Sequence, residues 1–220
     1  MIDQERMMPI SGLYLVTDRG LCGTRPLEEV VRAALDGGAT CVQLREKDVT
    51  TRFFLEEAGR LKKLLSDYGV PLIINDRLDV ALTVEADGVH VGQDDMPYEA
   101  ARRLMGPKAI IGLSVESWED VERARDMDVD YLGVSPIFET PTKTDTKGSW
   151  GLEGLARIRA YTRLPLVAIG GLNASNAEAA VLAGADSIAV VSAICAAPDP
   201  LKASRDLAGI IGSALAKRSA

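Results

Sequence analysis

Three polar side chains suited to holding an anion stand at alternate positions in the segment "QLREK". Gln43, Arg45 and Lys47 are each separated by one residue, so on extended backbone they point to the same face. Arginine can bind phosphate oxygens through two parallel hydrogen bonds, and lysine adds a compact positive charge. The spacing indicates a diphosphate site at a strand end, with a solvated strand end paired to Glu46 or Asp48 as an equal alternative.

Carboxylates close two further apolar runs. Asn75 and Asp76 follow "PLII", and Asp94 and Asp95 follow "GVHVGQ". Neighbouring strands lie about 4.8 Å apart, so two of these carboxylates could share one hard cation. Mg2+ commonly uses one or two protein carboxylates and completes its shell with water and phosphate oxygens. Each aspartate taken singly is better explained as the cap of a following helix.

Two later segments have the features of a phosphate site made from backbone N–H groups. Gly170 and Gly171 lie in "AIGGLNAS", and Val191 and Ser192 lie in "VVSA". Glycine lets the backbone approach an anion closely, and the N–H groups at a helix start point toward it. A Gly-Gly pair is often only a turn, but its position in the seventh of eight units favours phosphate binding.

The segment "FETPTKTDTKGSW" has threonine at every second position from Thr140 to Thr146, with Lys143 and Lys147 between them, directly after an apolar run. Hydroxyl and ammonium groups in this density predict a polar loop after a buried strand. His90 is the single histidine, which excludes a metal centre of several histidines. We expect His90 to be a packed or hydrogen-bonded imidazole inside a strand.

The elements that must position these residues alternate along the chain. Eight apolar runs rich in β-branched residues alternate with segments of helical spacing, and several runs share an acidic or small pair before them, as in "EADGVHVG" and "GADSIAVVS". The count predicts a single-domain (β/α)8 TIM barrel, although an open doubly wound sheet has the same local pattern. We expect residues 1–11 to form an N-terminal extension and residues 12–220 the catalytic barrel domain.

Composition narrows the class of protein. Aliphatic residues dominate, since 47% of residues are hydrophobic and 5% aromatic, as in buried parallel strands. A net charge of −7 argues against nucleic acid as a partner. The longest apolar stretch, "IAVVSAICAA", is too short to cross a bilayer, so we expect no membrane partner. Scattered cysteines and a start without an apolar signal segment predict a cytoplasmic protein.

Seven motifs occur in order on the predicted strand ends: "VQLREKD", "IINDR", "HVGQDD", "GLS", "TPTK", "AIGG" and "VS". With them the chain resembles the thiamine-phosphate synthases, also called thiamine-phosphate pyrophosphorylases, from Gly12 to about Pro200. The resemblance implies a (β/α)8-barrel transferase of thiamine biosynthesis. Such an enzyme joins a hydroxymethylpyrimidine diphosphate to a thiazole phosphate, uses Mg2+ and releases diphosphate.

The resemblance also implies roles for individual residues. The metal would be held by Asp76 and Asp95. The pyrimidine substrate and its diphosphate would be bound by Gln43, Arg45, Lys47, Asn75, Ser114 and Lys143, of which Arg45, Lys47, Ser114 and Lys143 would be catalytic. The thiazole phosphate would be bound by Thr140, Thr142, Gly171, Val191 and Ser192.

The implied substrates favour a dissociative mechanism. An electron-rich aminopyrimidine stabilises a benzylic-type cation, so diphosphate can leave before the thiazole nitrogen attacks, and no general base is required. The loop that carries Lys143 would close over the site and exclude water. Three alternatives are a thiazole tautomerase of the same barrel type, a non-catalytic barrel that binds a phosphate metabolite, and another phosphosugar-type barrel enzyme. A homo-oligomer is compatible with the sequence.

Overall fold

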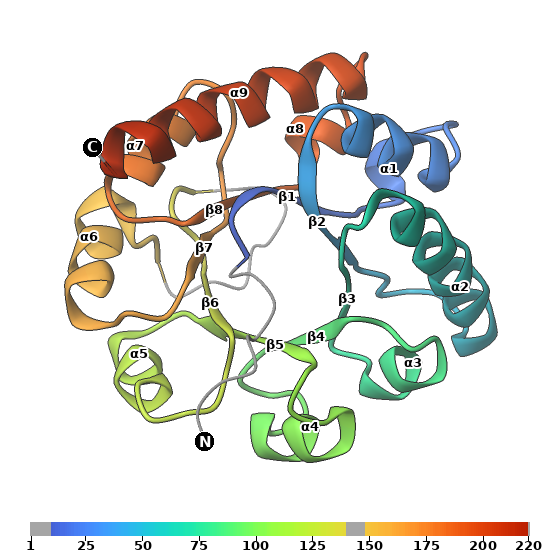
Figure 1. The fold of residues 1–220 in the computed structure, drawn as a ribbon, viewed down its shortest axis with the longest axis horizontal. Coiled ribbons are helices and arrows are strands. Elements are labelled where there is room, and N and C mark those ends of the chain that lie inside the picture. The colour runs from blue at the N-terminus through green and yellow to red at the C-terminus, as the bar shows by residue number, and fades with distance from the viewer. Residues whose placement is uncertain (1–9, 140–147, 220) are drawn as a thin grey trace.

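In the computed structural model, eight parallel strands form a closed barrel in chain order, and helices surround it (Figure 1). The structure describes residues 10–139 and 148–219. Each of the eight predicted strands is present, so the predicted (β/α)8 TIM barrel is confirmed. The strands are β1 (Gly12–Val16), β2 (Ala39–Leu44), β3 (Leu72–Asn75), β4 (Gly88–Val91), β5 (Ile110–Val115), β6 (Tyr131–Val134), β7 (Leu166–Ala168) and β8 (Ser187–Val190).

The helices follow the strands along the chain and cover the outside of the barrel. The helical elements are η1 (Gly20–Cys22), α1 (Leu27–Asp36), α2 (Thr51–Tyr68), α3 (Leu78–Thr83), α4 (Tyr98–Met105), α5 (Trp118–Ala124), α6 (Gly151–Tyr161), α7 (Ala177–Leu182), α8 (Ser192–Cys195) and α9 (Pro200–Ser219).

Helix α9 lies outside β8 and β1, between α7 and α1 (Figure 1). It buries Leu207, Ile211 and Ala214, which are spaced by four and three residues and therefore lie on one face of a helix. The C-terminal segment thus completes the helical layer on the side of the barrel where the first and last strands meet.

Two groups of buried side chains make up the core. The larger group lies between strands and helices, and Leu72, Ile74 and Leu61 are among its fully buried members. The smaller group lies inside the barrel and includes Ile10, Tyr14, Cys41, Ile73 and Tyr131. Ile10 is thus buried in the inner core although it falls within the predicted extension of residues 1–11. The boundary at residue 12 stays a prediction.

An aspartate directly before each of β4, β6 and β8 ties the amino-terminal end of the barrel together. Its carboxylate accepts a hydrogen bond from a backbone N–H of the preceding strand and pairs with a cation on the preceding even-numbered helix. The three sets are Asp87 with Leu72 and Lys62, Asp130 with Ile111 and Arg102, and Asp186 with Leu166 and Arg159. The weak sequence repeat before the strands therefore has a structural cause.

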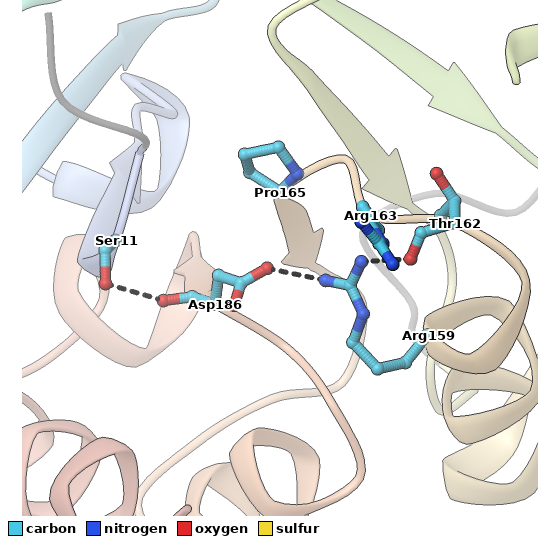
Figure 2. Close-up of a pocket in the computed structure, with 6 residues that line it drawn as sticks. All are labelled: Ser11, Arg159, Thr162, Arg163, Pro165 and Asp186. Carbon is cyan, nitrogen blue, oxygen red and sulfur yellow. Dashed lines mark hydrogen bonds and ion pairs between the residues drawn. The ribbon is translucent and has the colours of Figure 1, made fainter. Parts of the chain in front are cut away.

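Figure 2 shows Asp186 and Arg159 of the last set, at a pocket of about 470 Å³ on the amino-terminal side of the barrel. Arg159 Nη1 lies 3.0 Å from Asp186 Oδ2, and its Nη2 donates to Thr162 O. Arg218 Nη2, from α9, lies 2.6 Å from Asp186 Oδ1. Ser11 Oγ donates to Asp186 O at 3.1 Å. Asp186 therefore joins α6, β7, β8 and α9, and three of the residues that line this pocket, Ser11, Arg159 and Asp186, already pair with one another.

Candidate active site

The carboxyl-terminal ends of the strands surround a pocket of about 930 Å³. Every predicted site residue that the structure describes lines it: Gln43, Arg45, Lys47, Asn75, Asp76, Asp95, Ser114, Gly171, Val191 and Ser192. The remaining predicted residues, Thr140, Thr142 and Lys143, lie outside the described residues. Residues that are as far apart as 149 positions in the sequence, such as Gln43 and Ser192, thus meet in one cavity.

Lys47 and Asp76 form an ion pair across the pocket rim. Lys47 Nζ lies 2.7 Å from Asp76 Oδ2.

The N-cap of α3 is Arg77, without a side-chain cap, and that of α4 is Pro97. The interpretation of the aspartates as helix caps is therefore wrong for these two helices. The pairing of Lys47 with Glu46 or Asp48 is likewise replaced by the pair with Asp76, because Lys47 projects over the next strand end.

Asp76 and Asp95 face each other closely enough to perturb each other's titration. Burial acts to raise the pKa of Asp76, but hydrogen bonds to Lys47 and Asp95 outweigh it and lower the pKa. Burial raises the pKa of Asp95; the Gly92 N–H, 2.7 Å from its Oδ2, opposes this, and the neighbouring Asp76 carboxylate adds to it. Two carboxylates in such proximity repel each other when both are ionised, so a cation between them would relieve the repulsion.

Arg45 turns into the pocket while Glu46 turns away from it. The Arg45 guanidinium has no ion pair or hydrogen-bond partner among residues 10–139 and 148–219. Glu46 Oε1 lies 3.0 Å from Arg19 Nη2, which also lies 3.1 Å from Glu57 Oε2. Burial raises the pKa of Glu46, and Arg19 opposes that shift. The ion pairs behind the strand end anchor Glu46 and so present Arg45 and Lys47 to the pocket.

Polar side chains of the inner barrel form the pocket floor. Gln43 Nε2 donates to the Tyr14 hydroxyl at 2.9 Å, and that oxygen lies 2.9 Å from the Tyr131 hydroxyl. His90 lies between Tyr131 and Ser114, with Nδ1 2.9 Å from the tyrosine oxygen and Nε2 2.8 Å from Ser114 Oγ. His90 is therefore a hydrogen-bonded imidazole in a strand, as predicted, and it also lines the pocket.

The two glycines after β7 are required by backbone conformation and by close packing. Gly170 and Gly171 have φ values of 101° and 67°, which residues with a Cβ rarely adopt. A Cβ at Gly171 would lie 2.8 Å from Phe138 Cβ. The pair is therefore a turn as well as part of the pocket wall. Next to it, α8 begins at Ser192 with Val191 as its N-cap, and Val191 O accepts hydrogen bonds from the N–H groups of Ile194 and Cys195.

Tyr14, Tyr131 and Arg123 also line the pocket, and no role was predicted for them from the sequence. The signal for Tyr131 was its alternation with Gly133 and Ser135, since all three face the same side of one strand. Arg123 gave no such signal, because it reaches the pocket from helix α5, where it pairs with Asp120 and donates to Gln93.

Among the described residues there is no group of three or more histidine, cysteine or acidic side chains that could hold a metal. In the same part of the chain, no helix is both long and apolar enough to span a bilayer. The fold and site define a (β/α)8-barrel protein whose pocket offers cations, a carboxylate pair and a helix start to a phosphorylated ligand.

Comparison with known proteins specifies the family. The model of the thiamine monophosphate synthase family matches residues 13–194, and the chain belongs to this family. A thiamine-phosphate synthase of Albidiferax ferrireducens is 59% identical over 199 residues, which cover 90% of this chain and 91% of the relative. One of Leptospira biflexa is 55% identical over 198 residues, or 88% and 94% of the two chains. The structure of a thiamine phosphate pyrophosphorylase from Pyrococcus furiosus matches with a TM-score of 0.85 and 43% identity, covering 93% and 96%.

Proposed function

We propose that this chain is a transferase that makes thiamine phosphate. It joins a hydroxymethylpyrimidine diphosphate to a thiazole phosphate and releases diphosphate. The observation that carries the proposal is the convergence of Arg45, Lys47 and the Asp76–Asp95 pair in the pocket of a chain that belongs to the thiamine monophosphate synthase family. The relatives are a synthase or a pyrophosphorylase by name, which favours group transfer over the tautomerase and the non-catalytic barrel.

Each of the described residues at the substrate site would bind one of the two substrates. Gln43 and Asn75 would hold the pyrimidine ring, while Arg45, Lys47 and Ser114 would bind its diphosphate. Arg45 supports this role because its guanidinium is unpaired toward the pocket among the described residues, and a guanidinium binds phosphate oxygens in pairs.

The thiazole phosphate would bind on the opposite wall. Gly171, Val191 and Ser192 would hold it there through backbone N–H groups and the hydroxyl, which is how barrels commonly bind phosphate after their last two strands. Thr140, Thr142 and Lys143 would complete the two phosphate sites, and these three roles come from the family resemblance alone.

Asp76 and Asp95 have the donor chemistry for Mg2+. Two carboxylates that interact directly suit a hard cation that takes one or two protein oxygens and fills its shell with water and substrate phosphate. When bound, Mg2+ would neutralise charge on the leaving diphosphate. Lys47, now paired with Asp76, would then be released to the diphosphate oxygens.

A dissociative substitution fits these groups. As the bond to diphosphate breaks, negative charge grows on the leaving group, and Arg45, Lys47 and the Ser114 hydroxyl lie on the pocket side where they would stabilise it. The aminopyrimidine carries the positive charge, and the thiazole nitrogen attacks with its own lone pair. The residues therefore act by orientation and charge neutralisation, with no proton abstraction.

The test is diphosphate release by the purified protein given the pyrimidine diphosphate, with and without thiazole phosphate and Mg2+. We expect release only when all three are present, with thiamine phosphate as the second product in equal amount. Intact diphosphate under every condition would refute the transferase, and release without thiamine phosphate would reduce the activity to hydrolysis. The cytoplasmic location and a homo-oligomeric state remain predictions from the sequence and the family.

A further inference from the structure

Five side chains form one continuous hydrogen-bonded chain across the pocket floor. It runs from Gln43 through Tyr14, Tyr131 and His90 to Ser114, with separations of 2.9, 2.9, 2.9 and 2.8 Å between successive polar atoms. The two ends carry different parts of one ligand under the proposed function: Gln43 faces the pyrimidine ring, and Ser114 faces the diphosphate.

Each hydroxyl in this chain has a single proton to donate. Burial raises the pKa of Tyr14 and of Tyr131 well above 10, so both hydroxyls stay protonated. A neutral imidazole donates from one nitrogen and accepts at the other. A hydroxyl can accept two hydrogen bonds, but two neighbouring oxygens need a proton between them. If Tyr14 gives its proton to Gln43, every other bond in the series must therefore reverse, and two arrangements leave no proton in the series unpaired.

In the arrangement observed, Gln43 Nε2 donates to Tyr14. Tyr14 then donates best to Tyr131, because the other group beside its proton, the Cys41 sulfur, is a weak acceptor. Tyr131 in turn donates to His90 Nδ1, and His90 Nε2–H donates to Ser114 Oγ. Two groups remain for a ligand. Gln43 Oε1, which has no partner among the described residues and is not sealed from the pocket, can accept a hydrogen bond, and the Ser114 proton can be donated.

The opposite arrangement reverses both ends together. Ser114 would donate to His90 Nε2, and Tyr14 would donate to the Gln43 carbonyl oxygen. The Gln43 NH2 group would then face the ring, and the Ser114 oxygen would present only lone pairs to an anion. A ring carbonyl would favour this arrangement at Gln43, but a diphosphate would oppose it at Ser114.

We propose that Tyr14, Tyr131 and His90 are positioning residues that couple the two ends of the pyrimidine substrate, so that the site accepts a ring amino group and rejects a ring carbonyl. The inference rests on the proposed function. An amino group donates to Gln43, and a diphosphate accepts from Ser114. A substrate that carries both groups therefore favours the observed arrangement at both ends of the hydrogen-bonded series. A carbonyl analogue must forfeit one of the two hydrogen bonds and thereby leave a polar group unpaired.

Glycines on β5 and β6 make room for this chain. A Cβ at Gly112 would overlap the Tyr131 ring and approach His90 Nδ1, and a Cβ at Gly133 would lie 2.8 Å from His90 Cε1. The rings of His90 and Tyr131 stack with centroids 5.4 Å apart. The barrel interior is thus shaped to hold the two rings in contact, which keeps the chain continuous.

The test compares two ligands by calorimetry with Mg2+ and without thiazole phosphate: the pyrimidine diphosphate, and its analogue with a ring carbonyl in place of the amino group. For the native protein we expect the analogue to bind roughly 100-fold more weakly, about tenfold for the hydrogen bond it forfeits and about tenfold for the polar group left unpaired. In Tyr131→Phe the ends are uncoupled, so the difference should fall to about tenfold or less.

Ser114→Ala provides a second route that does not disturb the tyrosines. This substitution removes the end of the hydrogen-bonded series that faces the diphosphate. We nevertheless expect the affinity difference between the amino and the carbonyl ligand to fall to about tenfold. Lys47→Met removes a diphosphate contact outside the chain and should weaken both ligands equally. Tyr161→Phe, a tyrosine packed against Trp118 on the helical layer, should bind both ligands as the native protein does.

Unchanged ring selectivity in Ser114→Ala, or in a folded Tyr131→Phe, would overturn the coupling, as would a native protein with less than tenfold selectivity. Failure of the native protein to bind either ligand would refute the proposed function instead. The two failures are therefore distinguishable, and thermal denaturation of each variant shows which of them is folded.

Discussion

Lys47 Nζ lies 2.7 Å from Asp76 Oδ2, so a cation of the expected diphosphate site and a carboxylate of the expected metal site neutralise each other. Asp76 also adopts a φ of 61°, in the left-handed region that most residues with a Cβ avoid. Its backbone N–H donates to His90 O at 2.8 Å, which holds the residue in this conformation. The pair links two strand ends and keeps the pocket rim ordered.

Asp76→Asn should weaken the dependence of turnover on Mg2+. An amide lacks the charge that binds a divalent cation strongly, so the Mg2+ concentration for half-maximal diphosphate release should rise at least about tenfold. Titrating Mg2+ at saturating substrates measures this. Asp79→Asn, a few residues away on α3 and paired with exposed Arg77, is the matched control. An Mg2+ response like that of the native protein in Asp76→Asn would remove Asp76 from the metal site.

Asp186→Ala should destabilise the fold without affecting the pocket. The substitution leaves Arg159, Arg218 and the Leu166 N–H without their acceptor, which should cost about 2–4 kcal/mol of unfolding free energy. Urea unfolding measures the loss, and KM for both substrates should stay unchanged because the site lies at the opposite end of the barrel. Asp126→Ala is the control, because it removes a solvent-exposed ion pair with Arg125 and should be about as stable as the native protein. Equal stability of Asp186→Ala and Asp126→Ala would contradict the structural role of Asp186.

Asp120 should make stability depend on acid pH. Burial acts to raise its pKa, but the N–H groups of Glu116 and Ser117, the Ser117 hydroxyl and Arg123 outweigh it and hold the pKa below its usual value. A carboxyl with a lowered folded-state pKa stabilises the protein fully above its unfolded pKa of about 3.9 and loses that contribution as pH falls through the folded value.

The measurement compares the native protein with Asp120→Asn by urea unfolding across acid pH. At neutral pH the variant should be less stable by about 1–2 kcal/mol. The difference should shrink as the pH drops below about 4, because the unfolded chain then takes up a proton at this carboxyl, whereas the folded protein does so only at lower pH. A gap that stays constant down to the lowest pH would mean that the charge of Asp120 adds nothing to the capping hydrogen bonds.

Gly171→Ala should lower both stability and thiazole phosphate binding. The left-handed φ of 67° costs an alanine roughly 1–2 kcal/mol, and its Cβ would meet Phe138 Cβ and Glu139 O at 2.8 and 3.0 Å. KM for the thiazole phosphate should rise more than KM for the pyrimidine. Gly59→Ala on α2, where a Cβ has open space, should instead be as stable as the native protein or up to about 1 kcal/mol more stable. Similar behaviour of the two variants would contradict a specific requirement for glycine at residue 171.

The sequence by itself determined the eight strands and their order, because alternation of apolar runs with helical spacing is a local property. It also placed polar side chains at the strand ends, and every predicted site residue that the structure describes lines one pocket. The family resemblance supplied the assignment of substrates, which residue types alone left open. Ile10 lies in the inner core although it was assigned to an extension.

Only the tertiary structure decided which of these side chains meet. Lys47 pairs with Asp76 and Glu46 with Arg19, whereas sequence proximity suggested pairs within "QLREKD". Tyr14 and Tyr131, 117 residues apart, share a hydrogen bond that no spacing along the chain could indicate. The physical reason is barrel closure: periodicity sets which face of a strand a side chain occupies, but the register between strands and the space left by small residues such as Gly112 set its partners.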